Sequence, residues 1–270
     1  MWPARGRASD TGPVDPRPLA LVTGVSRGPG IAAAVARRLA ADGWDLALSG
    51  WRPYDAGMAW GRHDDELDEL LLGLTGSGVR TRYFDADFAD LDAPAGLYDA
   101  VVEEFGRSPL ALAVVHTHDT GGGLLEMSGA DFDHHMAVNA RATLLLAAEH
   151  ARRFAGPAGR GRIVTFVSGL PLRGSVAYAA SKGAVHWMTV SIAAELADRG
   201  ITANAVNPGP TDTGWMSPPV RQRIRGESPL GRIGRPEDAA ELVAWLCSEA
   251  GGWMTGQVLT SDGGWSTIRP

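Results

Sequence analysis

A tyrosine and a lysine stand four residues apart in the segment Tyr178-Ala-Ala-Ser-Lys182-Gly. On a helix this spacing places both side chains on one face, about one turn apart. A free phenol has a pKa of about 10, and a neighbouring cation lowers it toward the pH at which proton transfer is efficient. The pair predicts acid–base chemistry at an oxygen atom, with Tyr178 moving the proton and Lys182 as the assisting cation.

Lys182 is the only lysine in the chain, because the other 24 of its 25 basic residues are arginines. Arginine is never deprotonated and presents a planar fork of donors, whereas lysine is a compact charge with three donors. A position that keeps lysine in such an arginine-rich chain indicates a task for which arginine is unsuited. A chance placement is the alternative, since a single lysine has to fall somewhere.

A glycine-rich segment, Thr23-Gly-Val-Ser-Arg-Gly-Pro-Gly30, lies between an apolar run and a helical pattern. Glycines let backbone approach a pyrophosphate closely, and the helix that follows offers free N–H groups and the positive end of its dipole. A structural turn is the alternative in a chain with 35 glycines, but the placement between strand and helix favours a nucleotide site. The candidate residues are Gly24, Ser26, Arg27, Gly28 and Gly30.

Short apolar runs alternate with helical patterns along the chain. We expect strands at 19–23, 45–49, 79–85, 110–116, 162–167, 202–207 and 257–261, and helices at 30–42, 64–75, 92–105, 130–154, 175–198 and 236–248. This alternation predicts an α/β fold, a doubly wound parallel sheet of about seven strands with helices on both faces. Such sheets bind ligands at the carboxyl ends of their strands, where the glycine-rich segment lies.

The spacing Gly24-x-x-x-Gly28-x-Gly30, together with the later Tyr178–Lys182 pair, resembles the short-chain dehydrogenase/reductase family. The resemblance is nearest to its 3-oxoacyl-(acyl-carrier-protein) reductase-like members and runs from about residue 19 to residue 264. It implies a single Rossmann-type domain over 19–270. Residues 1–18 contain prolines and no apolar stretch, so we expect them to be a disordered lead-in. The resemblance also implies a homodimer or homotetramer in which the helices expected at 130–154 and 175–198 pair across a two-fold axis.

The resemblance gives each catalytic candidate a role. Ser168, at the end of the fifth expected strand, would hold and polarise the substrate oxygen, with Ser175 as the fallback. Lys182 would also bind the nicotinamide ribose. Asn139 matches the family's fourth catalytic residue, which helps to hold a water that relays protons to the lysine. A helix asparagine that bonds only locally is the alternative.

The resemblance also implies a nicotinamide dinucleotide. NAD binders usually carry an acid at the end of the second strand. Here the strand ends with Ser-Gly-Trp-Arg52, which contains no acid. Arg52 and Arg27 could pair with a 2′-phosphate, which favours NADP(H). Asp55 could act as the acid if the chain folds back, so NAD(H) stays open.

Further cofactor contacts are expected after the third and sixth strands. Asp87 matches the family's acceptor for the adenine amino group and has Phe88 beside it, with Asp85 as the alternative strand-end cap. After the sixth strand, backbone and a threonine hydroxyl would meet the carboxamide, while Asn207 braces the turn. The candidates there are Pro208, Gly209, Thr211 and Thr213.

Two features depart from the family pattern. The fourth strand ends Val115-His-Thr-His-Asp119 where Asn-Asn-Ala-Gly is usual. The larger side chains of His118 and Asp119 therefore occupy a place where small residues let the backbone pass beside the adenosine ribose. The connection from Ser168 to Tyr178 is a few residues short, which should reshape the substrate pocket. Its expected lining is apolar and includes Leu170, Pro171, Leu172, Trp215 and Met216. His116, His118 and Asp119 have no evident fourth partner, so we expect no metal.

Composition excludes several classes of protein. The net charge of −6 leaves no basic footprint for nucleic acid, and one cysteine excludes a disulfide framework. No apolar run approaches the roughly 18–20 residues of a membrane span, and the N-terminus lacks the core of a signal peptide. We therefore expect a cytoplasmic protein, and the family resemblance implies that it acts on a small-molecule carbonyl or alcohol.

The expected function is an NADP(H)-dependent oxidoreductase that interconverts a ketone and a secondary alcohol, working as a ketoreductase. A non-catalytic nucleotide-binding or sensing protein on the same fold is one alternative, motivated by the altered end of the fourth strand. Epimerase or dehydratase chemistry on the fold is the other. The Ser, Tyr, Lys and Asn set argues against a mere binder, which needs no acid–base tyrosine.

Overall fold

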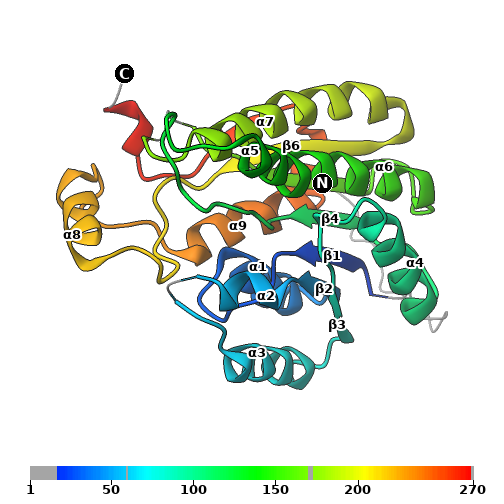
Figure 1. Ribbon diagram of the computed structural model, residues 1–270. Helices are drawn as coiled ribbons and strands as arrows, with labels where there is room; N and C mark the ends of the chain where they lie inside the picture. Colours follow the sequence, from blue (N-terminus) through cyan, green and yellow to red (C-terminus); the bar gives the residue numbers. More distant parts are fainter. Residues whose placement is uncertain (1–16, 59, 170–172, 269–270) are drawn as a thin grey trace, which may run out of the picture.

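Seven parallel strands form the centre of the protein (Figure 1). The computed structural model describes residues 17–58, 60–169 and 173–268. The strands lie in the order β3-β2-β1-β4-β5-β6-β7. Their bounds are β1 Leu19–Thr23, β2 Asp45–Gly50, β3 Thr81–Asp85, β4 Ala111–Val114, β5 Gly161–Phe166, β6 Ile201–Asn207 and β7 Val258–Thr260.

Helices cover both faces of this sheet (Figure 1). One face carries α1 (Ile31–Ala41), α3 (Asp64–Gly76) and α9 (Pro236–Cys247), and the other carries α4 (Ala93–Phe105), α6 (Ala142–Arg153) and α7 (Val176–Leu196). The smaller elements are α2 (Arg52–Ala56), α5 (Gly129–His135), a π-helical turn (Met136–Arg141), α8 (Pro218–Glu227), and 3-10 turns at Ala197–Arg199, Ala250–Trp253 and Trp265–Thr267.

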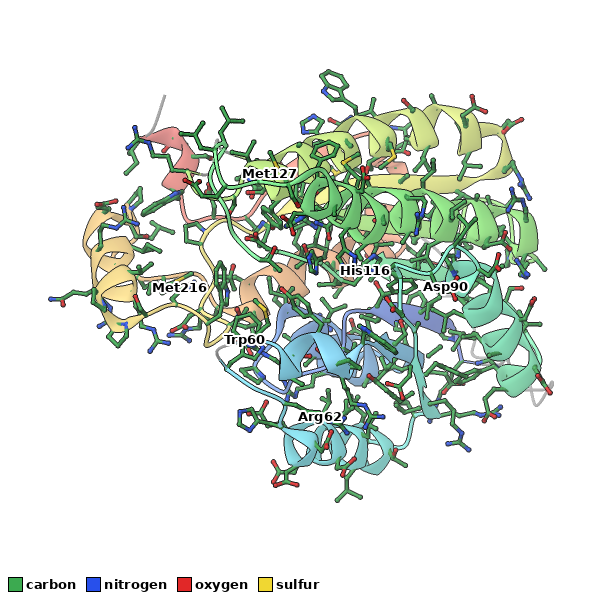
Figure 2. The ribbon with its side chains drawn as sticks, in the orientation of Figure 1. Trp60, Arg62, Asp90, His116, Met127 and Met216 are labelled. Atoms are coloured by element: carbon green, nitrogen blue, oxygen red, sulfur yellow. The ribbon has the colours of Figure 1, made fainter. Side chains whose placement is uncertain are left out.

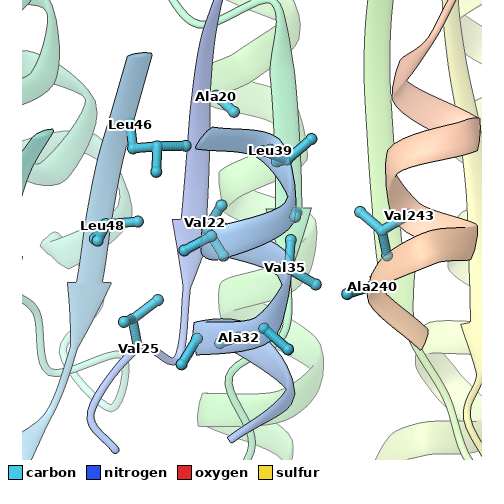
Figure 3. Close-up of a cluster of buried hydrophobic side chains, with 14 of the residues drawn as sticks. Ala20, Val22, Val25, Ala32, Val35, Leu39, Leu46, Leu48, Ala240 and Val243 are labelled. Atoms are coloured by element: carbon cyan, nitrogen blue, oxygen red, sulfur yellow. The ribbon is translucent and has the colours of Figure 1, made fainter. Parts of the chain in front are cut away.

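The core under α1 explains why the strands are apolar throughout rather than alternating. Both faces of β1 and β2 are buried, so side chains that point to either face of the sheet are covered by helices. On one side, Val22 and Leu48 meet Val35 of α1, and α1 in turn packs against Ala240 and Val243 of α9 (Figure 3). The many alanines of α1 let these helices approach closely.

The strand order reverses between β1 and β4, which pair directly with Thr23 opposite Val114. β2 and β3 lie to one side of β1, whereas β4 to β7 lie to the other. This is the switch point at which a doubly wound sheet opens a crevice at its carboxyl edge. The predicted site residues follow β1 to β6 at this edge, or lie on the helices next to it.

The expected fold is confirmed, including the seven parallel strands. Element ends differ from expectation by at most two residues, as at β4, which stops at Val114 rather than at residue 116. Two helices, α2 and α8, were not expected. The long helix expected at 130–154 is interrupted by the π-helical turn at Met136–Arg141. Residues 1–16 of the expected lead-in lie outside the described residues, whereas Pro18 accepts a hydrogen bond from Asp45 N–H at 2.8 Å.

Candidate active site

Lys182 lies in the second turn of α7 with only 4% of its surface exposed. Its Nζ donates to the carbonyl of Phe166 at 3.1 Å, at the end of β5. Burial lowers the pKa of Lys182 from 10.5 to about 8, because the charged form loses its hydration. The ammonium is therefore held at the sheet edge by one backbone carbonyl, beneath the ring of Tyr178, whose centroid lies 5.7 Å away.

Tyr178 lies in the first turn of α7, and burial raises the pKa of its phenol to about 12. The carboxylate of Asp119 adds to this rise, whereas a hydrogen bond with the Thr117 side chain opposes it. The lowering expected from Lys182 is therefore not found: burial is the largest cause of the shift, and it raises the pKa. A neutral phenol at pH 7 is the form that donates a proton.

Asn139 lies in the π-helical turn and is 1% exposed. Its Nδ2 donates to the carbonyl of His118 and to Ser181 Oγ, both at 2.9 Å, while its Oδ1 accepts from His118 N–H at 2.6 Å and from Thr117 Oγ1 at 3.3 Å. Ser181 in turn donates to the carbonyl of Tyr178 at 2.7 Å. Asn139 thus joins the end of β4 to α7, and its contacts reach well beyond its own helix.

Ser168 and Ser175 occupy different places. Ser168 is half-buried just after β5. Next to it, a Cβ on Gly169 would lie 2.3 Å from Nδ2 of Asn207, so the ends of β5 and β6 are in close contact here. Ser175 precedes the first residue of α7, and its hydroxyl donates to Asp119 Oδ2 at 3.3 Å. The hydroxyl of the fallback serine is therefore already bonded to the carboxylate of Asp119.

The unusual end of β4 is packed and bonded rather than loose. His116 is buried, its Nδ1 is 2.8 Å from Thr23 Oγ1 and its Nε2 is 2.9 Å from the carbonyl of Val138. Burial, and then the charge of Lys182, lower the pKa of His116 to about 3, so the imidazole is neutral. The ring of His118 meets three neighbouring rings in tilted or edge-to-face contacts, with centroids 4.3–5.3 Å apart: those of Tyr54, His134 and His135.

The glycine-rich segment after β1 makes a close turn against β4. Gly24 has a φ of +81°, and a Cβ there would lie 2.6 Å from the backbone nitrogen of His116, so only glycine fits. Gly28 N–H donates to Glu66 Oε2 at 3.1 Å, and Gly30 caps α1 without a side-chain bond. Ser26 is half-buried in the same turn.

Arg27 extends out of this turn toward the end of β6. Its guanidinium lies 4.7 Å from the ring centroid of Trp60 and donates to the carbonyl of Thr213. Trp60 and Met216, three residues beyond Thr213, lie at the same side of the molecule (Figure 2). Arg27 therefore spans the crevice rather than projecting freely toward a 2′-phosphate.

Arg52 lies at the start of α2, between two acids. It bonds Asp85 through Nε at 3.3 Å and Nη2 at 2.8 Å, and Asp64 is 3.6 Å away. Asp85 is therefore the ion-pair partner of Arg52 at the ends of β2 and β3. Asp55 is 4% exposed, and its Oδ1 accepts from the Trp60 indole at 2.8 Å. Within the described part of the chain, its buried Oδ2 has no hydrogen-bond partner.

The remaining cofactor candidates follow β3 and β6. Asp87 Oδ1 accepts from Ala89 N–H at 2.9 Å, and the ring of Phe88 packs 4.2 Å from that of His116. Asn207 braces the turn after β6 by accepting from Gly209 N–H at 3.2 Å. Thr211 is buried, and its hydroxyl bonds to the carbonyls of Pro208 and Gly209.

The expected substrate side is only partly described. Leu170, Pro171 and Leu172 lie outside the described residues. Trp215 is 57% exposed and Met216 half-buried, and both lie in the turn just before Ser217, the N-cap of α8. In the described ranges, no cluster of three or more His, Cys, Asp or Glu side chains could hold a metal ion. The same residues contain no helix long and apolar enough to cross a membrane.

The structure adds residues that the sequence did not indicate. Tyr54, Trp60 and Thr117 all take part in the site, through bonds to Asp119, Asp55 and Asn139 respectively. Tyr54 lies on α2 and Trp60 shortly after it, whereas Thr117 follows β4, and no local sequence pattern predicts which partners these residues meet. The only signal in the sequence is that Tyr54 and Trp60 are aromatic and follow the second strand, whose end is expected to contact a nucleotide.

A glycine turn after β1, and a buried lysine beneath a tyrosine on α7, lie at one edge of a parallel sheet; this arrangement defines a dinucleotide-dependent oxidoreductase. Residues 24–266 match the family described as enoyl-(acyl carrier protein) reductase. The chain belongs to the short-chain dehydrogenase/reductase family, as the motifs predict, and is an enzyme of the oxidoreductase class.

Three relatives illustrate the match. An uncharacterized oxidoreductase, YjdA, of Bacillus subtilis (strain 168) is 37% identical over 91% of this chain and 96% of its own. A (3R)-3-hydroxyacyl-CoA dehydrogenase of Mus musculus is 34% identical over 91% and 95%. A short chain dehydrogenase from Burkholderia cenocepacia J2315, solved in complex with NADP, superposes with a TM-score of 0.80 at 34% identity over 92% and 97%.

Proposed function

We propose that the protein is an NADP(H)-dependent ketoreductase that reduces a ketone to a secondary alcohol, with Tyr178 as the proton donor. The observation that carries the proposal is the pair formed by the buried ammonium of Lys182 and the phenol of Tyr178 above it. A pKa of about 12 keeps that phenol protonated at neutral pH, which suits reduction rather than oxidation.

In this mechanism Ser168 holds the carbonyl oxygen of the substrate while Tyr178 donates its proton to the developing alkoxide. The nicotinamide ring, when bound, supplies the hydride. The positive charge of Lys182 stabilises the phenolate that remains. Asn139 keeps the end of β4 and α7 at a fixed separation through its four hydrogen bonds. As the family resemblance implies, it also helps to hold the water that returns a proton.

The choice between NADP(H) and NAD(H) rests on Arg27 and Arg52, which favour NADP(H), and on Asp55, which favours NAD(H). Arg27 and Arg52 lie at the carboxyl ends of β1 and β2, where a 2′-phosphate could exchange for the carbonyl of Thr213 or the carboxylate of Asp85. The NADP-bound relative supports the same choice. NAD(H) is the second candidate, because the buried, unpartnered Oδ2 of Asp55 is suited to accept from a ribose 2′-hydroxyl.

The test is a kinetic panel of ketones, aldehydes and β-keto esters with NADPH and with NADH. We expect turnover of at least one ketone with NADPH, a higher kcat/KM for NADPH than for NADH, and loss of turnover in Tyr178→Phe. Cofactor binding without turnover on the whole panel would instead support a sensing protein. Turnover that survives in Tyr178→Phe would contradict the proposed chemistry.

We further propose a homodimer or homotetramer built on the outer faces of α6 and α7. These faces form a shallow apolar groove that includes Leu144, 44% exposed, and Trp187, 72% exposed. Exposed apolar surface of this kind marks an interaction site. We also place the enzyme in the cytoplasm as one domain over 19–270, in line with its single cysteine, Cys247, which is free and buried.

A further inference from the structure

Asp119, the acid that replaces a small residue at the end of β4, holds the beginning of α7. Its Oδ1 accepts from Gly121 N–H at 2.9 Å, and its Oδ2 accepts from Ser175 Oγ at 3.3 Å. Gly122 pairs with Ser175 as a parallel bridge, and Val176 N–H donates to the carbonyl of Gly122 at 3.5 Å. Residues 119–122 therefore act as a short support for the first turn of α7.

Asp119 is itself fixed from two sides. The Tyr54 hydroxyl accepts from Asp119 N–H at 3.2 Å and donates to its carbonyl at 3.0 Å, so one phenol clamps both backbone groups. His135, fully buried, points its Nε2 toward Asp119 Oδ1 at 3.7 Å. Asn139 clamps the backbone of the preceding residue, His118, in the same way. The support is thus anchored in α2 and in the α5–π segment.

The two departures from the family pattern therefore touch each other. The connection between Ser168 and Tyr178 is short, and Ser175, near its end, is the residue that Asp119 holds. Tyr178 follows Ser175 by three residues, within one helical turn. A shift at Ser175 would therefore move the phenol, and about 1 Å of misplacement is enough to cost a large factor in rate.

We propose that Asp119 is a positioning residue, which fixes the first turn of α7 and thereby the phenol of Tyr178 relative to β4. This inference rests on the proposed function of Tyr178 as the proton donor. It also explains why an acid is tolerated where the family has a small residue: the carboxylate supports the shortened connection before α7.

The negative charge of Asp119 also acts on the phenol of Tyr178, and this effect distinguishes a positioning role from simple packing. The charged and titratable groups that face Tyr178 are Asp119, Tyr54 and Lys182, with the Thr117 hydroxyl as a hydrogen-bond partner. Asp119 disfavours the phenolate. An asparagine at 119 keeps the shape and can bond both Gly121 and Ser175, but it lacks the charge.

The first test follows hydrogen exchange of the cofactor-free protein, so it needs no substrate. In Asp119→Ala we expect the amides of Val176 and Ala179 to exchange about 5- to 30-fold faster, since two hydrogen bonds are lost. Asp119→Asn should stay within about 3-fold of wild type. Asp90→Ala is the matched control, because Asp90 also accepts from a backbone N–H two residues on, but far from α7. Unchanged exchange in Asp119→Ala overturns the proposal.

The second test uses ketone reduction with NADPH. Asp119→Ala should lower kcat by about 10-fold or more while the NADPH Kd changes less than about 3-fold. In alcohol oxidation by Asp119→Asn, the acidic limb of the pH profile should move to lower pH, because the phenolate forms more easily. An unmoved limb together with wild-type kcat in both variants refutes the inference. If Tyr178→Phe is fully active, the proposed function fails instead, and hydrogen exchange alone decides the role of Asp119.

Discussion

Replacing Lys182 by arginine keeps the positive charge but changes its shape, and this tests why the chain has one lysine. The buried ammonium bonds the carbonyl of Phe166, and its pKa of about 8 leaves it about nine-tenths protonated at pH 7. The fall in pKa from 10.5 corresponds to about 3 kcal/mol of desolvation. Arginine cannot relieve such a cost by losing its proton, and its five donors would leave several without acceptors.

We therefore expect Lys182→Arg to lose about 2–3 kcal/mol of stability, or roughly 5–10 °C in Tm, and at least about 100-fold in kcat. Lys182→Met is the matched variant, because it has similar length and no charge. It should be as stable as wild type or more so, yet equally inactive. Thermal unfolding and NADPH-dependent ketone reduction measure both quantities. Near-normal turnover in Lys182→Arg would show that the lone lysine is only compositional drift, and a destabilised Lys182→Met would refute the desolvation argument.

Three other outcomes follow from the structure. Burial lowers the pKa of His116 and of His150 to about 3, below the unfolded value of 6.5, so both stay neutral in the fold. The two histidines therefore cost no stability above pH 6.5, and the free energy of unfolding falls as the pH drops toward 3, by up to about 3 kcal/mol per pH unit for the two together. An equal free energy of urea unfolding at pH 7 and pH 5 would disprove this. Trp187→Glu should shift the assembly toward monomer in analytical ultracentrifugation, and an unchanged sedimentation coefficient would place the interface elsewhere. Arg52→Ala should raise the Kd for NADPH more than for NADH, and Asp55→Asn should do the opposite; equal effects on both cofactors would remove these residues from the selectivity argument.

The sequence predicts the sheet well because each buried strand is a continuous apolar run, as at residues 19–23. It also places Tyr178 and Lys182 correctly, since their relation depends only on helix geometry. The sequence does not predict the contacts between segments that are far apart along the chain. Arg52 reads as a free cation in the sequence, but α2 turns it toward Asp85, and nothing within the strand itself indicates that partner.

The direction of the Tyr178 pKa shift shows the same limit. A nearby lysine predicts a lowered value, yet burial of the phenol, which depends on the packing of the whole site, raises it to about 12. The π-helical turn around Asn139 is another case. Its sequence resembles any helical segment, and its four hydrogen bonds appear only once β4 and α7 are placed beside it.

The most direct test of the account is the rate of NADPH-dependent ketone reduction by Tyr178→Phe, with the NADPH Kd measured on the same sample. The variant removes one oxygen atom from the site and leaves the ring in place. We expect kcat to fall by about 100- to 10,000-fold while the Kd stays within about 3-fold. A variant that binds NADPH normally and keeps wild-type kcat would contradict the assignment of Tyr178 as the proton donor.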